Sequence, residues 1–180
     1  MRIQRFLATL ILCSVFLVLL YALLLQAERG RYPITYEAEV NAWADAYGVP
    51  TSVVYAVIKV ESDFRVNAVS TAGAKGLMQI TDDTFEWIRS RIGSADDHVF
   101  APSTNIRYGA YYLSYLYGRF GDWEVALAAY NAGPNRVSGW IEEQGPSFTI
   151  PYRETREYVV RVQAAVRKYE KLYYQGDIKS

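Results

Sequence analysis

Hydrophobic and polar residues follow two patterns along this chain of 180 residues. Residues 6–25 are uncharged and almost entirely apolar. From about residue 36 onward, apolar residues recur every three or four positions, the spacing that places them on one face of an α-helix. The strict alternation that indicates a half-buried strand is weak. The pattern predicts an N-terminal apolar helix followed by one mostly α-helical domain.

The apolar segment 6–25 has the length of a membrane span, because 20 helical residues cover roughly 30 Å, the thickness of a bilayer core. A cleaved signal peptide usually has a shorter apolar core and small residues at its cleavage site, whereas residues 23–26 are three leucines and a glutamine. We therefore expect an uncleaved signal anchor over 6–25, a tail over 1–5 and a tether over 26–35. Two arginines flank each side, and the short tail with Arg2 and Arg5 favours a cytoplasmic N-terminus.

The periodic stretches, with proline, glycine and polar capping residues at their ends, predict the helices of the domain. We expect helices over residues 36–47, 51–61, 82–92, 102–120, 122–130 and 137–141, and a last long helix that begins at 151. Either Asp82 or Asp83 is the expected N-cap of its helix. Val160 is expected on the buried face of the last helix, whereas Tyr108 is expected away from the core face of helix 102–120. The domain is predicted to run over 36–174, followed by a tail over 175–180.

Charge and composition exclude several classes of function. The chain has 19 basic and 19 acidic residues, and from residue 32 onward 15 basic and 18 acidic ones. No basic patch stands out, which argues against nucleic acid as a partner. The only cysteine, Cys13, lies in the apolar segment, and His98 is the only histidine. Cysteine or histidine zinc sites and histidine-dependent triads are therefore excluded, and we expect no metal and no cofactor.

Glu61 is the strongest catalytic candidate. It ends the apolar, helix-like stretch that begins at Val53, and a glycine-punctuated loop follows it. A carboxyl group held against apolar neighbours resists ionisation, so its pKa rises and it can act as an acid near neutral pH. The alternative is an exposed glutamate at a helix end, although the helix dipole does not favour a negative charge there. Residue 61 alone does not decide between the two.

Four motifs in a fixed order accompany this glutamate. They are residues 61–80 (ESDFRVNAVSTAGAKGLMQI), 105–109 (NIRYG), 128–134 (AAYNAGP) and 151–159 (PYRETREYV). The series closely resembles the soluble-lytic-transglycosylase family, whose catalytic domain has a lysozyme-like, goose-type fold. The resemblance covers about residues 36–174 and implies the same helical fold for this domain.

The resemblance implies cleavage of the β-1,4 bond between N-acetylmuramic acid and N-acetylglucosamine in peptidoglycan. Glu61 would be the only catalytic acid and base. It would protonate the glycosidic oxygen and then take a proton from the C6 hydroxyl of the same muramic residue, whose oxygen attacks C1 to give a 1,6-anhydro end. This departs from the usual pair of carboxylates in glycosidases.

The resemblance also implies roles for other side chains. Five would contact the substrate, namely Ser70, Gln79, Tyr130, Asn131 and Tyr158, and four would support the site, namely Ser62, Gly76, Met78 and Glu154. Ser62 either orients the Glu61 carboxyl group or caps its helix, and Asn131 either lines the groove or caps its own. Thr81 departs from the family pattern, where a methionine often lines the cleft.

Two alternatives remain beside a membrane-anchored lytic transglycosylase. One is a muramidase on the same fold that hydrolyses the bond with water, and the other is a non-catalytic peptidoglycan-binding scaffold. For the main reading, the expected partners are peptidoglycan strands, the membrane through the N-terminal helix, and cell-wall or envelope-spanning assembly proteins. The expected location is the cell membrane, with a single span and the catalytic domain on the extracytoplasmic side.

Overall fold

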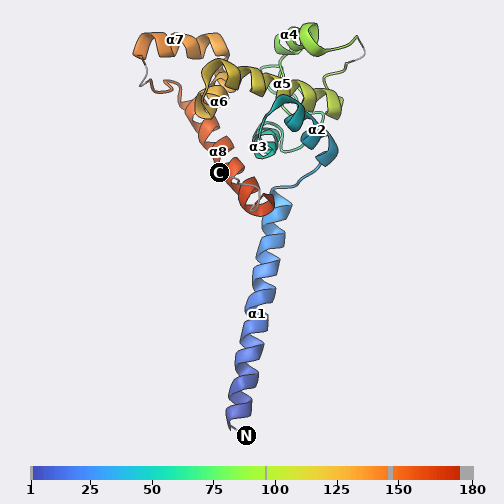
Figure 1. Ribbon diagram of the computed structural model, residues 1–180, viewed down its shortest axis with the longest axis vertical. Helices are drawn as coiled ribbons and strands as arrows, with labels where there is room; N and C mark the ends of the chain where they lie inside the picture. Colours follow the sequence, from blue (N-terminus) through green and yellow to red (C-terminus); the bar gives the residue numbers. More distant parts are fainter. Residues whose placement is uncertain (1, 96, 146–147, 175–180) are drawn as a thin grey trace. The chain divides into compact units, whose positions relative to one another are not determined.

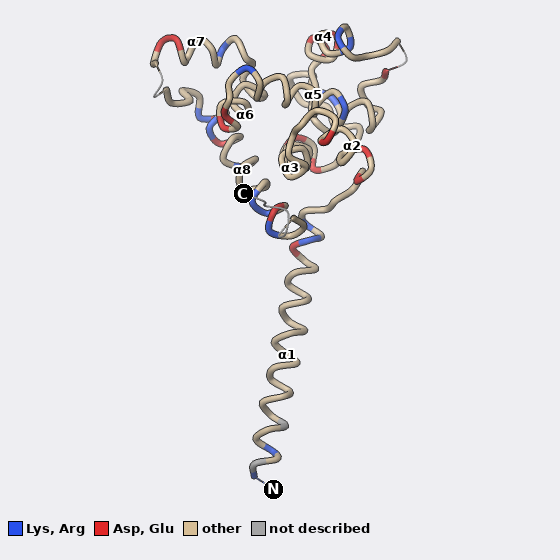
Figure 2. Tube along the Cα trace, viewed as in Figure 1, with Lys and Arg blue, Asp and Glu red and all other residues tan. Residues whose placement is uncertain are grey.

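The computed structural model describes residues 2–95, 97–145 and 148–174. The chain divides into two compact units, Met1–Pro33 and Ile34–Ser180. The first contains one helix, α1 (Arg2–Arg31), in which Gln4–Arg31 is long and apolar enough to cross a membrane, with a mean hydropathy of 2.7. Figure 2 shows that its charged residues lie only towards its two ends. Residues 26–31 of the expected tether belong to this helix. The tail expected over 175–180 lies outside the described residues.

The second unit consists of helices joined by loops over the residues that the structure describes (Figure 1). Its helices are α2 (Glu37–Tyr47), α3 (Thr51–Glu61), α4 (Asp82–Ile92), α5 (Pro102–Phe120), α6 (Trp123–Ala132), α7 (Pro134–Gln144) and α8 (Arg153–Tyr173). Within the described residues there is no strand, only the isolated antiparallel bridge pairs Val69–Lys75 and Lys75–Ile80. The mostly α-helical class predicted from the hydrophobic pattern is confirmed.

Helix α3 forms the centre of the core. Residues 52–58 are all buried, because the sequence there is apolar on every face of the helix. It packs against α8, α2 and α5, while α6 packs against α5, α7 and α8. Each fully buried aliphatic or aromatic side chain contributes roughly 1.5–3 kcal/mol to folding. The C-terminal end of α3, where Glu61 lies, is therefore anchored firmly by the helix that precedes it.

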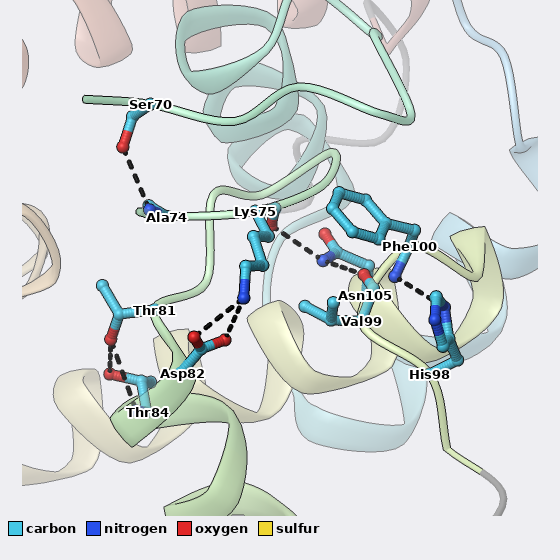
Figure 3. Close-up of polar contacts among 10 residues, drawn as sticks. All are labelled: Ser70, Ala74, Lys75, Thr81, Asp82, Thr84, His98, Val99, Phe100 and Asn105. Atoms are coloured by element: carbon cyan, nitrogen blue, oxygen red, sulfur yellow. Dashed lines mark hydrogen bonds and ion pairs between the residues drawn. The ribbon is translucent and has the colours of Figure 1, made fainter. Parts of the chain in front are cut away.

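One predicted N-cap and one predicted helix length were wrong. Thr81 caps α4, since its hydroxyl accepts a hydrogen bond from the Thr84 amide at 3.3 Å (Figure 3). Asp82, one of the expected caps, instead pairs with Lys75, with Nζ and Oδ1 2.6 Å apart. Helix α7 is longer than the predicted 137–141, because Gly133, with a φ of 91°, ends α6 and Pro134 begins the next helix at once.

Two predicted burials were also wrong. Val160 is 61% exposed, because the buried stripe of α8 passes through Tyr158, Val162 and Ala165 and leaves residue 160 on another face. Tyr108 was expected away from the core but is fully buried. Its ring packs against Phe85 of α4 at 4.8 Å, and its hydroxyl donates to Asp97 Oδ2 at 2.5 Å.

The loop between α3 and α4 is held by one buried amide from α5. The Asn105 side chain accepts from the Met78 amide at 2.7 Å and donates to the carbonyls of Lys75 and Val99 at 3.1 and 2.7 Å (Figure 3). Gly76 lies directly against this amide with a φ of +80°. A Cβ at residue 76 would come within 2.3 Å of Asn105 Nδ2 and 2.9 Å of the Val99 carbonyl. The close approach requires glycine.

We predict that Gly76→Ala destabilises the domain by about 3 kcal/mol, since backbone strain at positive φ and overlap with Asn105 add together. Gly73→Ala is the matched control, because residue 73 has a φ of +79° but no neighbour within 4 Å. It should cost only about 1 kcal/mol, from the backbone strain alone. Thermal unfolding of the full chain in detergent, followed by tryptophan fluorescence, measures the difference, since all 4 tryptophans lie in the second unit. Equal losses in the two variants would contradict the steric explanation.

Candidate active site

Glu61 is the last residue of α3 and is partly buried. Burial raises the pKa of its carboxyl group from 4.5 to about 7, which the Tyr158 hydroxyl and the positive charge of Arg161 oppose. No aspartate or glutamate of the described chain is among the groups that shift this pKa. A carboxyl group with a pKa near 7 is protonated in part at neutral pH and can both donate and accept a proton.

Two tyrosines, the buried Tyr158 and the half-buried Tyr130, lie close to this carboxyl group. Burial raises the pKa values of Tyr130 and Tyr158 well above 10, and the negative charge of Glu61 raises them further. The Tyr158 ring is 2% exposed, and its hydroxyl forms no hydrogen bond of ordinary geometry with the described residues. Its interaction with Glu61 nevertheless lowers the pKa of that carboxyl group. The Tyr130 hydroxyl donates to the Met78 carbonyl at 2.7 Å.

Ser62 does not bond to the Glu61 carboxyl group. Its side chain is almost fully buried and donates to the carbonyls of Leu77 at 2.7 Å and Ile58 at 3.2 Å. The first of these bonds fastens the end of α3 to the loop that precedes α4. Ser62 thus acts on Glu61 through the backbone. Met78, which lies in the same loop, is fully buried and packs against Gly109 of α5.

Gln79 adopts a left-handed backbone conformation, with a φ of 49°. Its side-chain Nε2 donates to the carbonyls of Gly76 at 2.9 Å and Ala68 at 3.1 Å. These two acceptors determine which end of the amide faces the loop, and both donor hydrogens are used. Its Oε1 accepts no hydrogen bond from the described residues. The side chain of Gln79 can therefore accept a hydrogen bond from a ligand through Oε1, but it has no free N–H to donate.

A hollow of about 210 Å³, here called the groove, brings several of the predicted residues together. Its lining includes Gln79 and Thr81 from the α3–α4 loop, Tyr130 and Asn131 from the end of α6, and Tyr112 from α5. Glu61 does not line the groove itself. Tyr130 connects the two, since it lines the groove and lies close enough to Glu61 for the carboxylate charge to raise its pKa.

The other predicted residues lie outside the groove lining. Ser70 is exposed, and its hydroxyl accepts from the Ala74 amide at 3.0 Å, which closes a turn in the loop (Figure 3). Glu154 is exposed in the first turn of α8, where a negative charge suits the helix dipole. It makes no hydrogen bond or ion pair with any residue that the structure describes.

Sequence reasoning missed two residues of this site. Arg161 follows Tyr158 by three positions on α8, which places both on one helix face, and that spacing was a usable signal. Tyr112 lines the groove from the middle of α5, and its ring lies 5.5 Å from that of Tyr130. No motif marked it. Over the described ranges, no group of three or more His, Cys, Asp or Glu side chains is placed to hold a metal ion.

The chain is similar to a known family and to several known proteins. A family model described as "Transglycosylase SLT domain" matches residues 39–150. The soluble lytic murein transglycosylase of Escherichia coli K12 is 33% identical over 159 residues, which cover 82% of this chain and 24% of that protein. A membrane-bound lytic murein transglycosylase C from Yersinia pestis is 29% identical over 164 residues, covering 73% of this chain and 46% of the other.

Solved structures give the same result. The 70-kDa soluble lytic transglycosylase from Escherichia coli superposes with a TM-score of 0.74 at 33% identity, covering 83% of this chain and 26% of that one. An inactive mutant of lytic transglycosylase Slt from Pseudomonas aeruginosa superposes with a TM-score of 0.72 at 33% identity, covering 80% and 25%. The chain spans about a quarter of the length of the first of these relatives. The family resemblance of its motifs is confirmed, and the chain belongs to the Transglycosylase SLT domain family.

Proposed function

We propose that this chain is a peptidoglycan lytic transglycosylase in which Glu61 is the only catalytic acid and base. The observation that carries the proposal is the carboxyl group of Glu61, which burial gives a pKa of about 7 beside a groove that Gln79, Tyr130 and Asn131 line. Membership of the transglycosylase family supports the choice of substrate. The single glutamate exchanged for glutamine in the inactive Pseudomonas aeruginosa relative is the kind of residue that this role requires.

The reaction needs one proton donor and one internal nucleophile. The protonated Glu61 donates to the glycosidic oxygen as the bond between C1 of N-acetylmuramic acid and that oxygen breaks. The resulting carboxylate accepts the proton of the C6 hydroxyl of the same sugar, and O6 forms the new bond to C1. The product carries a 1,6-anhydro ring, Glu61 is protonated again, and no water is consumed.

The surrounding side chains support the two states of Glu61 differently. Burial favours the protonated carboxyl group that begins the reaction, whereas Tyr158 and Arg161 stabilise the carboxylate that follows. The free Oε1 of Gln79 is suited to accept from an N-acetyl N–H or a sugar hydroxyl. Tyr130 and Asn131 line the same groove. Ser70 lies on the exposed loop before it, where we assign it to substrate contact as well.

The same proposal places the enzyme at the cell membrane. The apolar helix α1 and the membrane-bound relative from Yersinia pestis support membrane anchoring. We infer a cytoplasmic tail over 1–5, a span over 6–25 and a catalytic domain over 36–174 on the extracytoplasmic side, where peptidoglycan lies. Cell-wall or envelope-spanning assembly proteins are the partners that such a location would bring close.

Glu61→Gln should lower the rate of glycan cleavage by at least about 10³-fold, because an amide cannot transfer the proton. Mass spectrometry of digested sacculi measures the products, and the wild-type chain should release 1,6-anhydro ends, which are lighter by one water than reducing ends. Glu143→Gln, an exposed acid of α7, is the matched control and should cleave at the wild-type rate. Reducing ends would identify a muramidase, and a wild-type chain without activity would favour a non-catalytic scaffold.

Tyr158→Phe should move the pH dependence of cleavage upward. The tyrosine hydroxyl lowers the pKa of Glu61, so its removal raises that pKa further above 7. The acid must be protonated to begin the reaction, and activity therefore falls as pH rises through this pKa. A profile of kcat/KM against pH should show the alkaline limb of the variant at higher pH than that of the wild type. If the alkaline limb stays in place or moves to lower pH, the Tyr158 hydroxyl does not lower the pKa of Glu61.

Glu61→Gln should also stabilise the folded domain above neutral pH. The folded-state pKa of about 7 lies above the ordinary value of 4.5, so the stability that the protonated form provides is complete below pH 4.5 and is lost as pH rises through 7. The glutamine variant has no such loss. It should unfold with a free energy about 3 kcal/mol higher than the wild type at pH 8.5, and equal to it at pH 4. The same tryptophan fluorescence measurement tests this, and a gain independent of pH would exclude ionisation as its cause.

A further inference from the structure

The exposed face of α8 is positively charged along the second half of the helix. Between residues 160 and 173 the helix carries four basic residues and one acidic residue, Glu170, which is half-buried (Figure 2). The exposed side chains of the same stretch, here called the basic face, are Val160, Arg161, Ala164, Arg167 and Lys171. No acid lies among them, so this face attracts anions.

Most of the basic face forms a single stripe. Its residues 160, 164, 167 and 171 follow one another at steps of four, three and four, which places them along one side of the helix over about 17 Å. Arg153, in the first turn of α8, pairs with Glu157 at 2.7 Å. Arg167 and Lys171 form no ion pair or side-chain hydrogen bond with any residue that the structure describes. Their charges can therefore meet a partner outside the chain.

The basic face ends close to the point where the chain enters the domain. The ring of Tyr55 in α3 stacks on Tyr169 of α8 at 5.3 Å, and Tyr169 stacks on Tyr173 at 6.1 Å. Burial raises the pKa of Tyr55 above 10, and the charges of Tyr174, at the end of α8, and Glu37, at the start of α2, raise it further. The start of α2 and the end of α8 therefore both lie near this one buried side chain.

A short linker keeps this end of the domain near the candidate membrane span. Helix α1 ends at Arg31 and α2 begins at Glu37, so only residues 32–36 separate them. An extended chain covers about 3.5 Å per residue, so Glu37 stays within about 21 Å of Arg31 in every arrangement of the two units. The end of α8 that carries Arg167 and Lys171 is therefore never far from a bilayer that α1 crosses.

We propose that the basic face of α8 binds the anionic headgroups of the bilayer in which α1 is anchored. Lipid phosphates attract arginine and lysine side chains that lie within about 10 Å of the surface, the Debye length at ordinary ionic strength. Val160, 61% exposed, adds an apolar contact with the interface. Glu37 and Glu39 oppose the attraction only weakly, because they lie at the positive end of the α2 dipole. The inference rests on the membrane location given in the proposed function.

Binding along this face would hold the candidate acid near the bilayer. Tyr158 and Arg161, which both act on the Glu61 carboxyl group, lie at the end of the stripe away from Lys171. About 15 Å of helix separate Arg161 from Lys171. A domain bound through α8 keeps its acid at a nearly fixed height, and the glycan that it reaches is the glycan close to the membrane.

The test measures how close two points of the domain come to lipid headgroups. The full chain carries Cys13→Ser, which removes its only cysteine, and one reporter cysteine, either Ala164→Cys in the basic face or Glu143→Cys on α7. Each is labelled with a fluorophore and reconstituted into vesicles in which one lipid in three is phosphatidylglycerol and some headgroups carry a nitroxide quencher. The label at residue 164 should be quenched strongly and the label at residue 143 weakly.

Arg167→Gln together with Lys171→Gln should release the domain from the surface, because each exposed cation there favours the bound state by about fivefold. The pair should lower the ratio of bound to released domain by about thirtyfold. Quenching at residue 164 should then fall to the value at residue 143, and vesicles of phosphatidylcholine alone should give the same fall with the unchanged face. Tryptophan fluorescence verifies that the domain remains folded.

Arg91→Gln together with Arg136→Gln is the matched control, since both arginines are exposed and belong to α4 and α7. It removes the same charge and should leave the quenching unchanged. The proposal is overturned by equal quenching at the two reporters, by quenching that neither the α8 pair nor the loss of phosphatidylglycerol lowers, or by an equal fall with the control pair.

Two parallel measurements separate this proposal from the proposed function. Flotation of the vesicles reports whether α1 anchors the chain, and a chain that does not float overturns both the membrane location and the lipid contact. Digestion of sacculi reports the activity. If the chain floats and the quenching depends on Arg167 and Lys171 but no glycan is cleaved, the proposed activity fails and the lipid-binding face does not.

Discussion

Three hydrogen bonds converge on the backbone of residues 77 and 78, and each comes from a different part of the core. Ser62 at the end of α3 donates to the Leu77 carbonyl, Asn105 of α5 accepts from the Met78 amide, and Tyr130 of α6 donates to the Met78 carbonyl. Buried peptide groups must find partners, so these bonds hold the loop in one place. Because Glu61 precedes Ser62 directly and Gln79 follows Met78, the same bonds set the position of the acid relative to the groove.

Ionisation of the buried Glu61 carboxyl group costs free energy of folding, and the packing of α3 must compensate for that loss. Burial of the Glu61 carboxyl group beside the phenols of Tyr130 and Tyr158 destabilises its ionised form, and Arg161 and Tyr158 compensate only in part. A fully paired carboxylate would be more stable at neutral pH, but its lowered pKa would leave it ionised there, with no proton to give to a glycosidic oxygen. The rigid apolar helix before Glu61 makes this loss tolerable, which is the usual exchange of stability for activity at an active site.

The helices and the raised pKa of the Glu61 carboxyl group could be predicted from the sequence because both rest on local signals. The apolar stretch of α3 ends at the predicted residue, and Pro102 and Gly121 delimit α5. The contacts between residues far apart in the sequence could not be predicted in this way. Asn105 reaches a loop almost thirty positions earlier, and nothing near residue 108 indicates that its tyrosine lies buried under α4. Val160 was misplaced because three β-branched or aromatic residues are adjacent at 158–160 of α8, and periodicity alone does not decide which of them faces outward.

Helix α5 connects the groove to a second hollow of about 280 Å³. Asn105, in its first turn, fastens the loop that carries Gln79, and Arg119, near its last, lines the second hollow. Fourteen residues of helix separate the two side chains, a rise of about 21 Å, which is the length of several sugar units. A helix of this length does not bend easily when its apolar face is buried, so it fixes the separation between the loop beside the acid and Arg119.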